Sequence, residues 1–341
     1  MLYFLQVCIG SGARSSGMRA GVQKIFRGVK MYYFIVNLRS RAGMGRKAWA
    51  QAEKHLKLAK VPYRSYMTEY KGHAAKIAAD ITSPQNLGNE PATIVVLGGD
   101  GTLNEVLNGL RISPNISLCY IPSGSGGDFA RAMGLKKAPV KALENIISTG
   151  SFRYLDYGIV TYADTHPVHK RFIVSSGIGY DAAVCENINR TKLKKVFNRL
   201  HMGKIAYLCI GIKQIVQSKP SNGYIILDGT RRINLRNIRF ISSHIHKYEG
   251  GGFAFAPKAD PSDGKMDLCV VACPTRLRFT LILLASLIGK HNLMGGANIY
   301  RCSEAEIHTE IPLFVHTDGE IPGKQTDIYM HCETGKLRFI C

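Results

Sequence analysis

Short apolar runs alternate with amphipathic segments through the first 150 residues of the chain. Strands are predicted at 31–37, 63–70, 93–98 and 116–121, and helices at 47–59 and 72–81. A further helix is indicated by Leu103, Val106, Leu107 and Leu110, which fall at i, i+3, i+4 and i+7 and form one apolar stripe. This alternation predicts an α/β nucleotide-binding domain with a doubly wound parallel sheet over residues 31–150.

The pattern changes near Ser151, where short strands become the dominant predicted element. Strands are predicted at 172–175, 224–227, 238–242, 266–272 and 313–317, and helices at 204–216 and 279–288. So many short strands predict a second domain, β-rich and sandwich-like, over residues 151–325. We expect residues 1–30, which precede the first strand, to be a disordered extension.

A glycine-rich turn with one carboxylate, GGDG at 98–101, links the strand at 93–98 to the helix that follows it. Unpaired amide groups and the positive end of the helix dipole make such a turn favourable for phosphate. Asp100 would repel bare phosphate, so a magnesium-nucleotide is the better ligand. For this motif alone, an ordinary strand-to-helix turn with Asp100 as the helix cap is the alternative explanation.

A second glycine-rich loop, PSGSGGDFAR at 122–131, follows the next predicted strand. Loops at the carboxyl ends of neighbouring parallel strands converge on one crevice, where such folds bind ligands. We therefore expect the two loops to share one site, although Asp128 is also explained as a helix N-cap. Gly43 and Gly45 indicate a third flexible and basic loop after the first strand.

Five separated motifs resemble the bacterial diacylglycerol kinase-like lipid kinases, which are related to sphingosine kinases and NAD kinases. In the family's order they are GGDGTLNEVLNG at 98–109, PSGSGGDFAR at 122–131, SSGIGYDAAV at 175–184, GGGFAFAPKADPSDGKMDL at 250–268 and HTDGE at 316–320. The resemblance covers the chain from about Met31 to its end. It implies that the lipid binds in the cleft between the two domains, and that residues 326–341 return to the first domain.

The resemblance also implies which residues form the site. ATP would be contacted by Asn37, Ser40, Gly43, Thr68, Gly98, Gly99, Asp100, Gly101, Thr102, Leu103, Asn104 and Ser125. Asp318 and Glu320 would provide the carboxylate that deprotonates the lipid hydroxyl, with Asp100 helping to position magnesium and phosphates. The chain departs from the family pattern at Leu38, where Pro usually follows Asn37, and at Ser125 and Gly127, where Thr and Asn are common.

Two acidic segments have a competing explanation as turns. Asp-Gly is a leading hairpin dipeptide that occurs at Asp228, Asp263 and Asp318, so the DGE run alone is typical of a turn. The resemblance implies instead that Asp260 and Asp263, with a main-chain carbonyl near Lys265, hold a structural Mg²⁺ through oxygen ligands. The histidines at 244, 246 and 316 do not have the spacing of metal ligands.

A net charge of +21, from 45 Lys and Arg against 24 Asp and Glu, favours contact with anionic phospholipid or nucleic acid. The densest basic runs are at 190–199 and 230–239. The first predicts either an amphipathic helix suited to a membrane interface or a solvated helix face. Nucleic acid is the less favoured partner, because no aromatic-basic RNA motif is visible.

The remaining features concern the compartment. The most apolar stretch, 279–289, is shorter than the ~20 residues that a spanning helix requires. Residues 1–10 lack the basic region and cleavage site of a signal peptide. Nine cysteines without a CxxC pair indicate reduced thiols rather than disulfides or a zinc site. We therefore expect a cytoplasmic protein, peripherally associated with the inner face of the membrane; a homodimer is compatible with the sequence.

These observations predict an ATP- and Mg²⁺-dependent lipid kinase that phosphorylates the hydroxyl of a diacylglycerol-like lipid. An NAD kinase-like small-molecule kinase would share the GGDGT element, but the LNEVLNG, GGG and DGE runs favour a lipid kinase. The alternative from another class is a basic membrane- or nucleic-acid-binding protein whose kinase site has decayed. The presence of Asp100, Asp318 and Glu320 argues against it.

Overall fold

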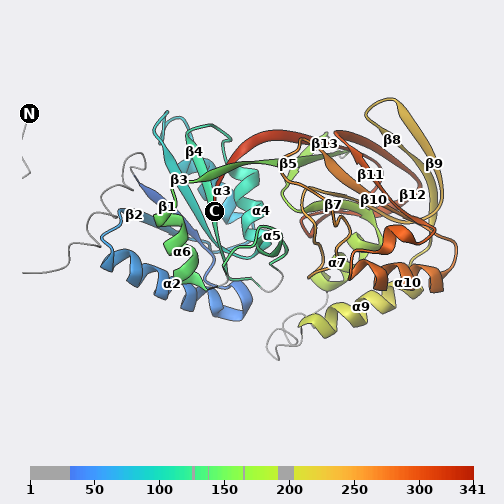
Figure 1. Cartoon of the computed structure of the whole chain (residues 1–341), viewed down its shortest axis with the longest axis horizontal. Coiled ribbons are helices and arrows are strands. Elements are labelled where there is room, and N and C mark those ends of the chain that lie inside the picture. The colour runs from blue at the N-terminus through green and yellow to red at the C-terminus, as the bar shows by residue number, and fades with distance from the viewer. Residues whose placement is uncertain (1–30, 125–126, 137, 164–165, 191–202) are drawn as a thin grey trace, which may run out of the picture.

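The computed structural model of the chain describes residues 31–124, 127–136, 138–163, 166–190 and 203–341 (Figure 1). The predicted extension at 1–30 and almost all of the basic run at 190–199 lie outside these residues. None of the helices described is both long and apolar enough to cross a membrane.

Four strands of the first part pair in parallel, in the order β2-β1-β3-β4. They are β1 Tyr32–Val36, β2 Tyr63–Met67, β3 Ala92–Gly98 and β4 Ile116–Pro122. The helices of this part are α2 Ser40–Leu58, α3 His73–Ile81, α4 Asp100–Gly109, α5 Asp128–Ala132 and α6 Pro139–Ser148. Every residue of β3 is buried, as expected for a parallel strand that is covered on both faces.

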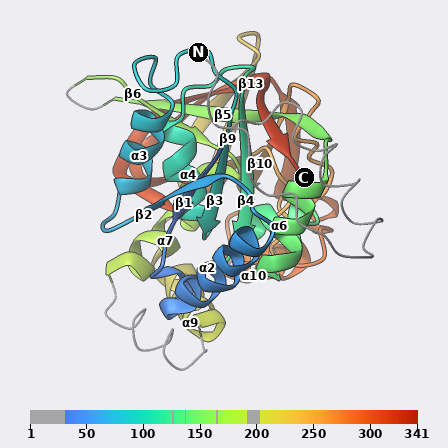
Figure 2. The ribbon, with the colours of Figure 1, turned by 90° about the vertical axis from the view of Figure 1, so that its left-hand side faces the viewer.

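Successive side chains of β3 enter two different cores. Ile94 and Val96 pack with residues of α3 and α4, whereas Val95 and Leu97 pack with residues of α2 and α6. Figure 2 shows these helices on opposite sides of the strands. Because the strands are parallel, the loops after β1, β3 and β4 leave from the same edge of the sheet.

The second part consists mainly of antiparallel strands. They are β5 Phe152–Tyr162, β6 Val168–Phe172, β7 Ser175–Gly179, β8 Ser221–Leu227, β9 Arg231–His244, β10 Met266–Ala272, β11 Ala297–Cys302, β12 Glu304–Thr317 and β13 Glu320–Ile340. Its helices are α7 Tyr180–Arg190, α9 Gly203–Gln217, α10 Arg276–Ser286 and the short 3-10 helix η1 His291–Leu293. Its buried apolar side chains form two main clusters, one among the strands and a second that includes residues of β9, β10 and α10.

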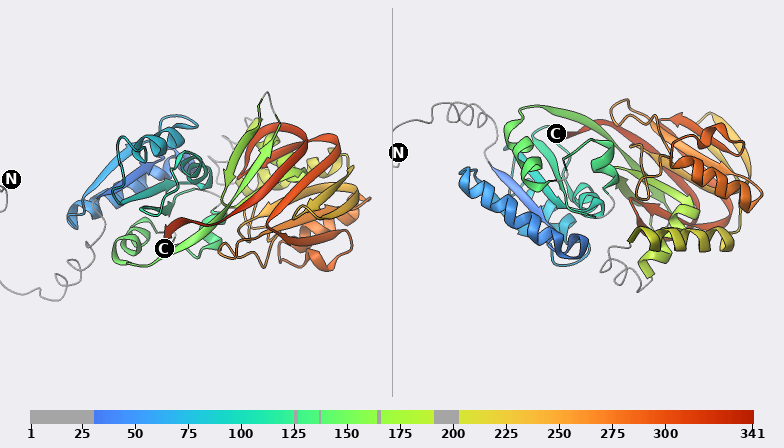
Figure 3. Two further views of the ribbon diagram at one scale, coloured as in Figure 1. Left: turned by 90° about the horizontal axis from the view of Figure 1, so that it is seen from above. Right: turned by 60° about the horizontal axis from the view of Figure 1, so that its bottom comes forward.

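Two long strands, β5 and β13, join the two parts (Figures 1 and 3). They pair with each other in antiparallel fashion from Ile328 to Ile340 of β13. Near its end, β13 also pairs in parallel with β4, through Phe339 and Leu118. The last residues of the chain therefore lie in the sheet of the first part.

The predicted strand at 172–175 is wrong. In the structure β6 ends at Phe172 and β7 begins at Ser175. The amides of Ile173, Val174 and Ser175 donate to the carboxylate of Asp318 instead of to a neighbouring strand. A long-range side chain thus interrupts a segment whose apolar composition predicted a continuous strand.

Two predicted helices begin earlier than expected. The helix predicted at 47–59 begins at Ser40, although Arg41, Ala42 and Gly43 have left-handed rather than helical backbone angles. The helix predicted at 279–288 begins at Arg276, because the hydroxyl of Thr275 accepts a hydrogen bond from the amide of Arg278 and caps it.

Candidate active site

The GGDG turn connects β3 to α4 in the way that the sequence predicted. Gly99 is the N-cap of α4 and Asp100 is its first residue, so the interpretation of Asp100 as a side-chain cap is wrong. Leu103, Val106, Leu107 and Leu110 are all buried, which confirms the predicted stripe. A Cβ on Gly98 would lie 2.7 Å from Cβ of Thr102, so this position has no room for a side chain.

The loops after β1, β3 and β4 converge. A Cβ on Gly124 would lie 2.6 Å from Cα of Gly99, so the loops after β3 and β4 pack glycine against glycine. The hydroxyls of Ser40 and Ser123 are 2.7 Å apart. The side-chain amide of Asn37 donates to the hydroxyl of Thr102 at 3.0 Å. These contacts confirm that the loops lie together at one edge of the sheet; Ser125 lies outside the described residues.

The loop after β1 has an unusual backbone. Arg41, Ala42 and Gly43 have φ angles of 44°, 53° and 94°, and L side chains rarely occupy this left-handed region. Conformations of this kind cluster at binding sites, where the surrounding structure holds them in place. Thr68 lies next to this loop, because its amide donates to the carbonyl of Val36 at the end of β1.

Asp100 is held by two hydrogen bonds at the centre of these loops. The hydroxyl of Tyr120 donates to Oδ1 at 3.2 Å, and the amide of Asp128 donates to Oδ2 at 3.0 Å. Burial and the charge of Asp128 raise the pKa of Asp100 from 3.8 to about 6. Each oxygen keeps acceptor capacity for another donor. Asp100 is therefore a carboxylate with a raised pKa at the start of α4, in the glycine-rich turn.

Asp128 connects Asp100 to the second part of the molecule. Gly127, not Asp128, is the N-cap of α5, and no side-chain cap is present, so the predicted capping role is wrong. The carboxylate of Asp128 instead accepts from the amide of Gly251 at 2.8 Å and pairs with Arg131 at 3.1 Å. A Cβ on Gly252 would lie 2.5 Å from Arg131, so the triple-glycine run permits this close approach.

Asp318 occupies a two-residue hairpin turn, and its half-buried carboxylate joins the two parts of the molecule. Asp318 and Gly319 both have positive φ angles, 47° and 85°, between paired Thr317 and Glu320. The carboxylate accepts four hydrogen bonds of 2.7–2.9 Å, from the side chain of Asn104 and the amides of Ile173, Val174 and Ser175. Two bonds to each oxygen use its lone pairs fully. In this arrangement Asp318 positions other groups and has no acceptor capacity left for a substrate hydroxyl.

Glu320 lies apart from this junction. Its carboxylate pairs with the ammonium group of Lys71 in the loop after β2, and both side chains are partly exposed. Asp318 and Glu320 therefore do not act on one another in this arrangement, because each carboxylate has its own partners. The pair places Glu320 beside the first part of the chain, at the edge of the site.

Further side chains, which sequence reasoning missed, fix α4 against the second part. The side-chain amides of Asn104 and Asn108 donate to the carbonyl of Arg171, both at 2.9 Å. The Arg171 guanidinium donates to the carbonyls of Leu107 and Leu110 at the end of α4, where a cation also complements the helix dipole. These partners are more than sixty positions apart, and nothing in a single sequence links them.

The predicted metal residues have other partners. The carboxylate of Asp263 pairs with the guanidinium of Arg301 and accepts from the amide of Lys265. Asp260 accepts from the amide and hydroxyl of Ser262, which lowers the pKa of Asp260. The ammonium group of Lys265 donates to Ser303. With a guanidinium on Asp263, this donor set does not fit a structural Mg²⁺ as arranged.

A buried polar cluster, Asp181, Glu249 and His316, lies beneath the site. Nε2 of His316 is 3.1 Å from Asp181 and 3.4 Å from Glu249. Burial alone would lower the pKa of His316, but the two carboxylates outweigh it and raise that pKa to about 9. His316 lies in β12, two residues before Asp318, so the cluster is close in sequence to the hairpin turn. Sequence reasoning missed this cluster, because its members come from three distant segments.

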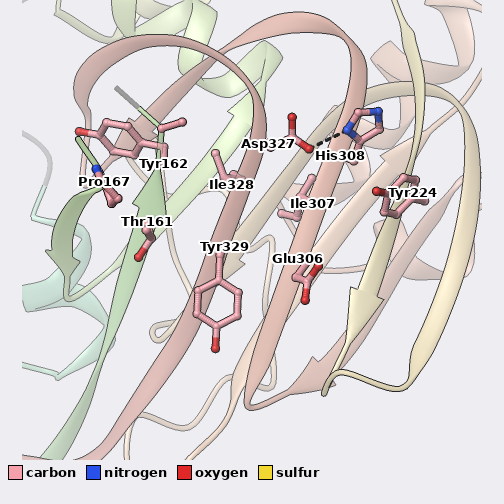
Figure 4. A pocket seen from close by; sticks show the side chains of 11 residues that line it. Thr161, Tyr162, Pro167, Tyr224, Glu306, Ile307, His308, Asp327, Ile328 and Tyr329 are labelled. Atoms are coloured by element: carbon pink, nitrogen blue, oxygen red, sulfur yellow. Dashed lines mark hydrogen bonds and ion pairs between the residues drawn. The ribbon is translucent and has the colours of Figure 1, made fainter. Parts of the chain in front are cut away.

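A separate groove of about 460 Å³ lies on the strands of the second part (Figure 4). Residues of β5, β8, β12 and β13 line it, and His308 and Asp327 form an ion pair across neighbouring strands. No residue of the glycine loops belongs to this lining. The groove is therefore distinct from the candidate active site.

Comparisons with known proteins cover both parts of the chain. Residues 31–160 match "Diacylglycerol kinase catalytic domain", and residues 173–341 match "YegS C-terminal NAD kinase beta sandwich-like domain". The chain is 29% identical over 293 residues to "Putative lipid kinase YtlR" of Bacillus subtilis (strain 168), covering 86% of this chain and 94% of the relative. It is 30% identical over 237 residues to "Probable lipid kinase YegS-like" of Pseudomonas aeruginosa (strain UCBPP-PA14), covering 67% and 70%.

A solved structure has the same fold. It is described as "Crystal structure of a putative diacylglycerol kinase from Bacillus anthracis str. Sterne", with a TM-score of 0.72 at 21% identity over 91% of this chain and 95% of that one. The two matched families follow one another along the chain, and Gly251 and Asp318 of the second make hydrogen bonds with Asp128 and Asn104 of the first. The chain therefore belongs to the family of bacterial diacylglycerol kinase-like lipid kinases, as its five motifs predicted.

Proposed function

We propose that the protein transfers the γ-phosphoryl group of ATP to the hydroxyl of a diacylglycerol-like lipid at a membrane surface, giving a phosphatidic acid-like product and ADP. The observation that carries this proposal is the position of Asp100. It combines a raised pKa, spare acceptor capacity and a place in the phosphate-binding turn. A base with a pKa near the working pH is the effective kind in proton transfer.

In the proposed reaction the lipid hydroxyl oxygen bonds to the γ-phosphorus while the bond to the ADP oxygen breaks. The hydroxyl proton passes to the carboxylate of Asp100. Such a transfer depends on positioning and charge neutralisation more than on covalent catalysis. Mg²⁺ enters as part of the MgATP substrate and neutralises phosphate charge there.

We assign the nucleotide to the convergent loops. The amides of the turn at 98–104 would face the phosphates, and Asn37, Ser40, Gly43 and Thr68 would form the neighbouring wall. The hydrogen bonds from Asn37 to Thr102 and from Ser40 to Ser123 support this assignment, because they hold the loops in one arrangement. Preformed loops lose less conformational entropy when ligand binds.

We assign Asp318 a positioning role in place of the proton transfer that the family resemblance implied. Through Asn104 it fixes the first turn of α4, and through residues 173–175 it fixes the second part against that turn. Glu320, paired with Lys71, would lie at the rim of the lipid entrance. We propose a division into residues 31–150, which the last residues of 326–341 join, and residues 151–325, with the acceptor lipid between them; Ile328 and Met330 pack in the core of the second part.

The test is phosphoryl transfer from labelled ATP to a panel of lipids in mixed micelles, with NAD included. A labelled product from diacylglycerol, absent with NAD, is the expected result. Transfer to NAD alone would establish a small-molecule kinase. Failure of every acceptor, in a protein that still binds MgATP, would favour a decayed kinase site.

A further inference from the structure

Helix α10 has two apolar stripes, although packing requires only one. Its inner stripe is buried against the second part, with Phe279, Ile282, Leu283 and Ser286 facing inward. An outer stripe is formed by Leu277, Leu281 and Leu284 of α10 and continues to Ile288 in the turn after it; these side chains are 72%, 45%, 57% and 70% exposed. Four aligned, exposed aliphatic side chains form a continuous patch, which marks an interaction site rather than ordinary surface.

The patch continues beyond α10. Leu287 and Leu293, which follow the helix, are 50% and 78% exposed. Helix α9 lies against α10 (Figures 1 and 3), and its Ile212 and Val216 are also more than half exposed. We call this surface of α9 and α10 the docking face. Single exposed leucines are ordinary on protein surfaces, but the docking face gathers several exposed apolar side chains.

The docking face is basic at its edges. Arg276 and Arg278 begin α10, Lys290 follows it, and Lys213 and Lys219 lie in and after α9. The segments 203–220 and 274–297 contain no Asp or Glu. Exposed leucines flanked by Lys and Arg are the composition of helices that lie in a membrane interface, where cations meet anionic headgroups.

We propose that the docking face binds the surface of an anionic bilayer, with the outer stripe of α10 inserted at headgroup level. This inference rests on the proposed function, which needs a lipid acceptor. A second copy of the chain is the less favoured occupant, because a two-fold interface would place these basic edges against one another. At eleven residues, α10 is suited to lie on the bilayer, not to cross it.

The docking face is connected to the candidate active site through one loop. The amide of Ala254 donates to the carbonyl of Ser286 at the end of α10. Three residues earlier, the amide of Gly251 donates to Asp128, whose own amide donates to Asp100. A bilayer bound to α10 would therefore lie near the part of the molecule where the lipid hydroxyl must react.

The experiment compares two double variants of the full chain by vesicle co-sedimentation. Leu281→Ser/Ile288→Ser makes the outer stripe polar, and Leu58→Ser/Ile311→Ser removes two exposed apolar side chains elsewhere. On vesicles of equal phosphatidylcholine and phosphatidylglycerol we expect the first to lose about tenfold or more in partitioning and the second to match the parent. Equal binding by the parent and both variants would overturn the proposal.

A second measurement does not depend on tolerance of polar substitutions. Leu284→Trp keeps the stripe apolar and adds a fluorophore, while the one native tryptophan, Trp49, is buried in the first part. Brominated phosphatidylglycerol should quench the new residue, and lack of quenching would overturn the proposal. The proposal would also be overturned if the parent were a dimer that does not bind vesicles and that Leu281→Ser/Ile288→Ser converts to a monomer.

Turnover of a short-chain, water-soluble diacylglycerol separates the two proposals. Leu281→Ser/Ile288→Ser should retain the parent's rate on this acceptor, because no bilayer is involved. If the parent phosphorylates neither this acceptor nor diacylglycerol in micelles, the proposed function is wrong. The vesicle measurements would still show whether the docking face binds a bilayer.

Discussion

Two Asp-Gly turns in this molecule have similar backbone angles at the Asp and the Gly, and very different surroundings. Asp228-Gly229 and Asp318-Gly319 both join antiparallel strands, and all four residues have positive φ angles. Asp228 accepts hydrogen bonds from the amides of Ser303 and Glu304 at an exposed edge. Asp318 is half-buried between α4 and the second part, and its carboxylate accepts from four donors. The dipeptide determines the turn, and long-range packing determines what its carboxylate does.

The largest effect on turnover is expected from a substitution of Asp100, the proposed proton acceptor. Asp100→Asn should lower kcat by about 10²–10⁴-fold, the usual scale of general-base catalysis, because an amide cannot take up the lipid proton. The variant should melt no lower than the parent at pH 7. Its amide can keep both hydrogen bonds, donating to Tyr120 and accepting from the amide of Asp128.

The direction of the stability change follows from the raised pKa of Asp100. The folded state keeps the proton up to about pH 6, whereas the unfolded chain loses it near 3.8, so the parent loses stability as pH rises through this window. The Asn variant lacks that loss. Parent-like turnover in the folded variant would remove Asp100 from the reaction.

The comparison of the two turns is tested directly by Asp318→Asn against Asp228→Asn. The NH2 group of Asn at position 318 would face the N–H groups that now donate to the carboxylate, and none of these can accept. This should lower the free energy of unfolding by on the order of 3 kcal/mol, or Tm by roughly 6–12 °C. Asp228→Asn should change stability by less than about 1 kcal/mol, because Asn also suits this exposed turn. Calorimetry of both variants provides the measurement.

One outcome would reverse the assignment of Asp318. If Asp318→Asn melted like the parent and yet lost about 10²-fold or more in kcat, Asp318 would be the proton acceptor that the family resemblance implied. A positioning role requires that stability and turnover fall together.

The contrast between the two turns also explains which features of the fold and of the candidate site could be predicted from the sequence. Periodicity located the strands β1 to β4 and the stripe of α4, because both depend on neighbours within a few positions. The shared site of the glycine loops followed from a general rule for parallel strands. The bonds of Asp318 to Asn104 and of Asp128 to Gly251 span 214 and 123 positions, so only the folded chain reveals them.

A smaller effect should appear in the pH profile. If Asp100 must be ionised to act, kcat/KM should fall about tenfold per pH unit below pH 6. Asp128→Asn removes the nearby negative charge and keeps the backbone amide that donates to Asp100. The pKa of Asp100 should then fall, and the acid limb should move to lower pH. An acid limb that does not move would mean that another group titrates.

The smallest effect is expected at the exposed turn that contains Asp263, and it tests the predicted metal site. A partly exposed ion pair such as Asp263 with Arg301 contributes about 0–1 kcal/mol, so Asp263→Ala should lower Tm by only a few degrees. Added Mg²⁺ or chelator should shift parent and variant equally, because the guanidinium already supplies the positive charge. A ligand that binds only the folded state raises stability by mass action. A Mg²⁺-dependent rise in Tm that Asp263→Ala abolishes would therefore show that Arg301 gives way to the metal, and would make this turn, too, part of a functional site.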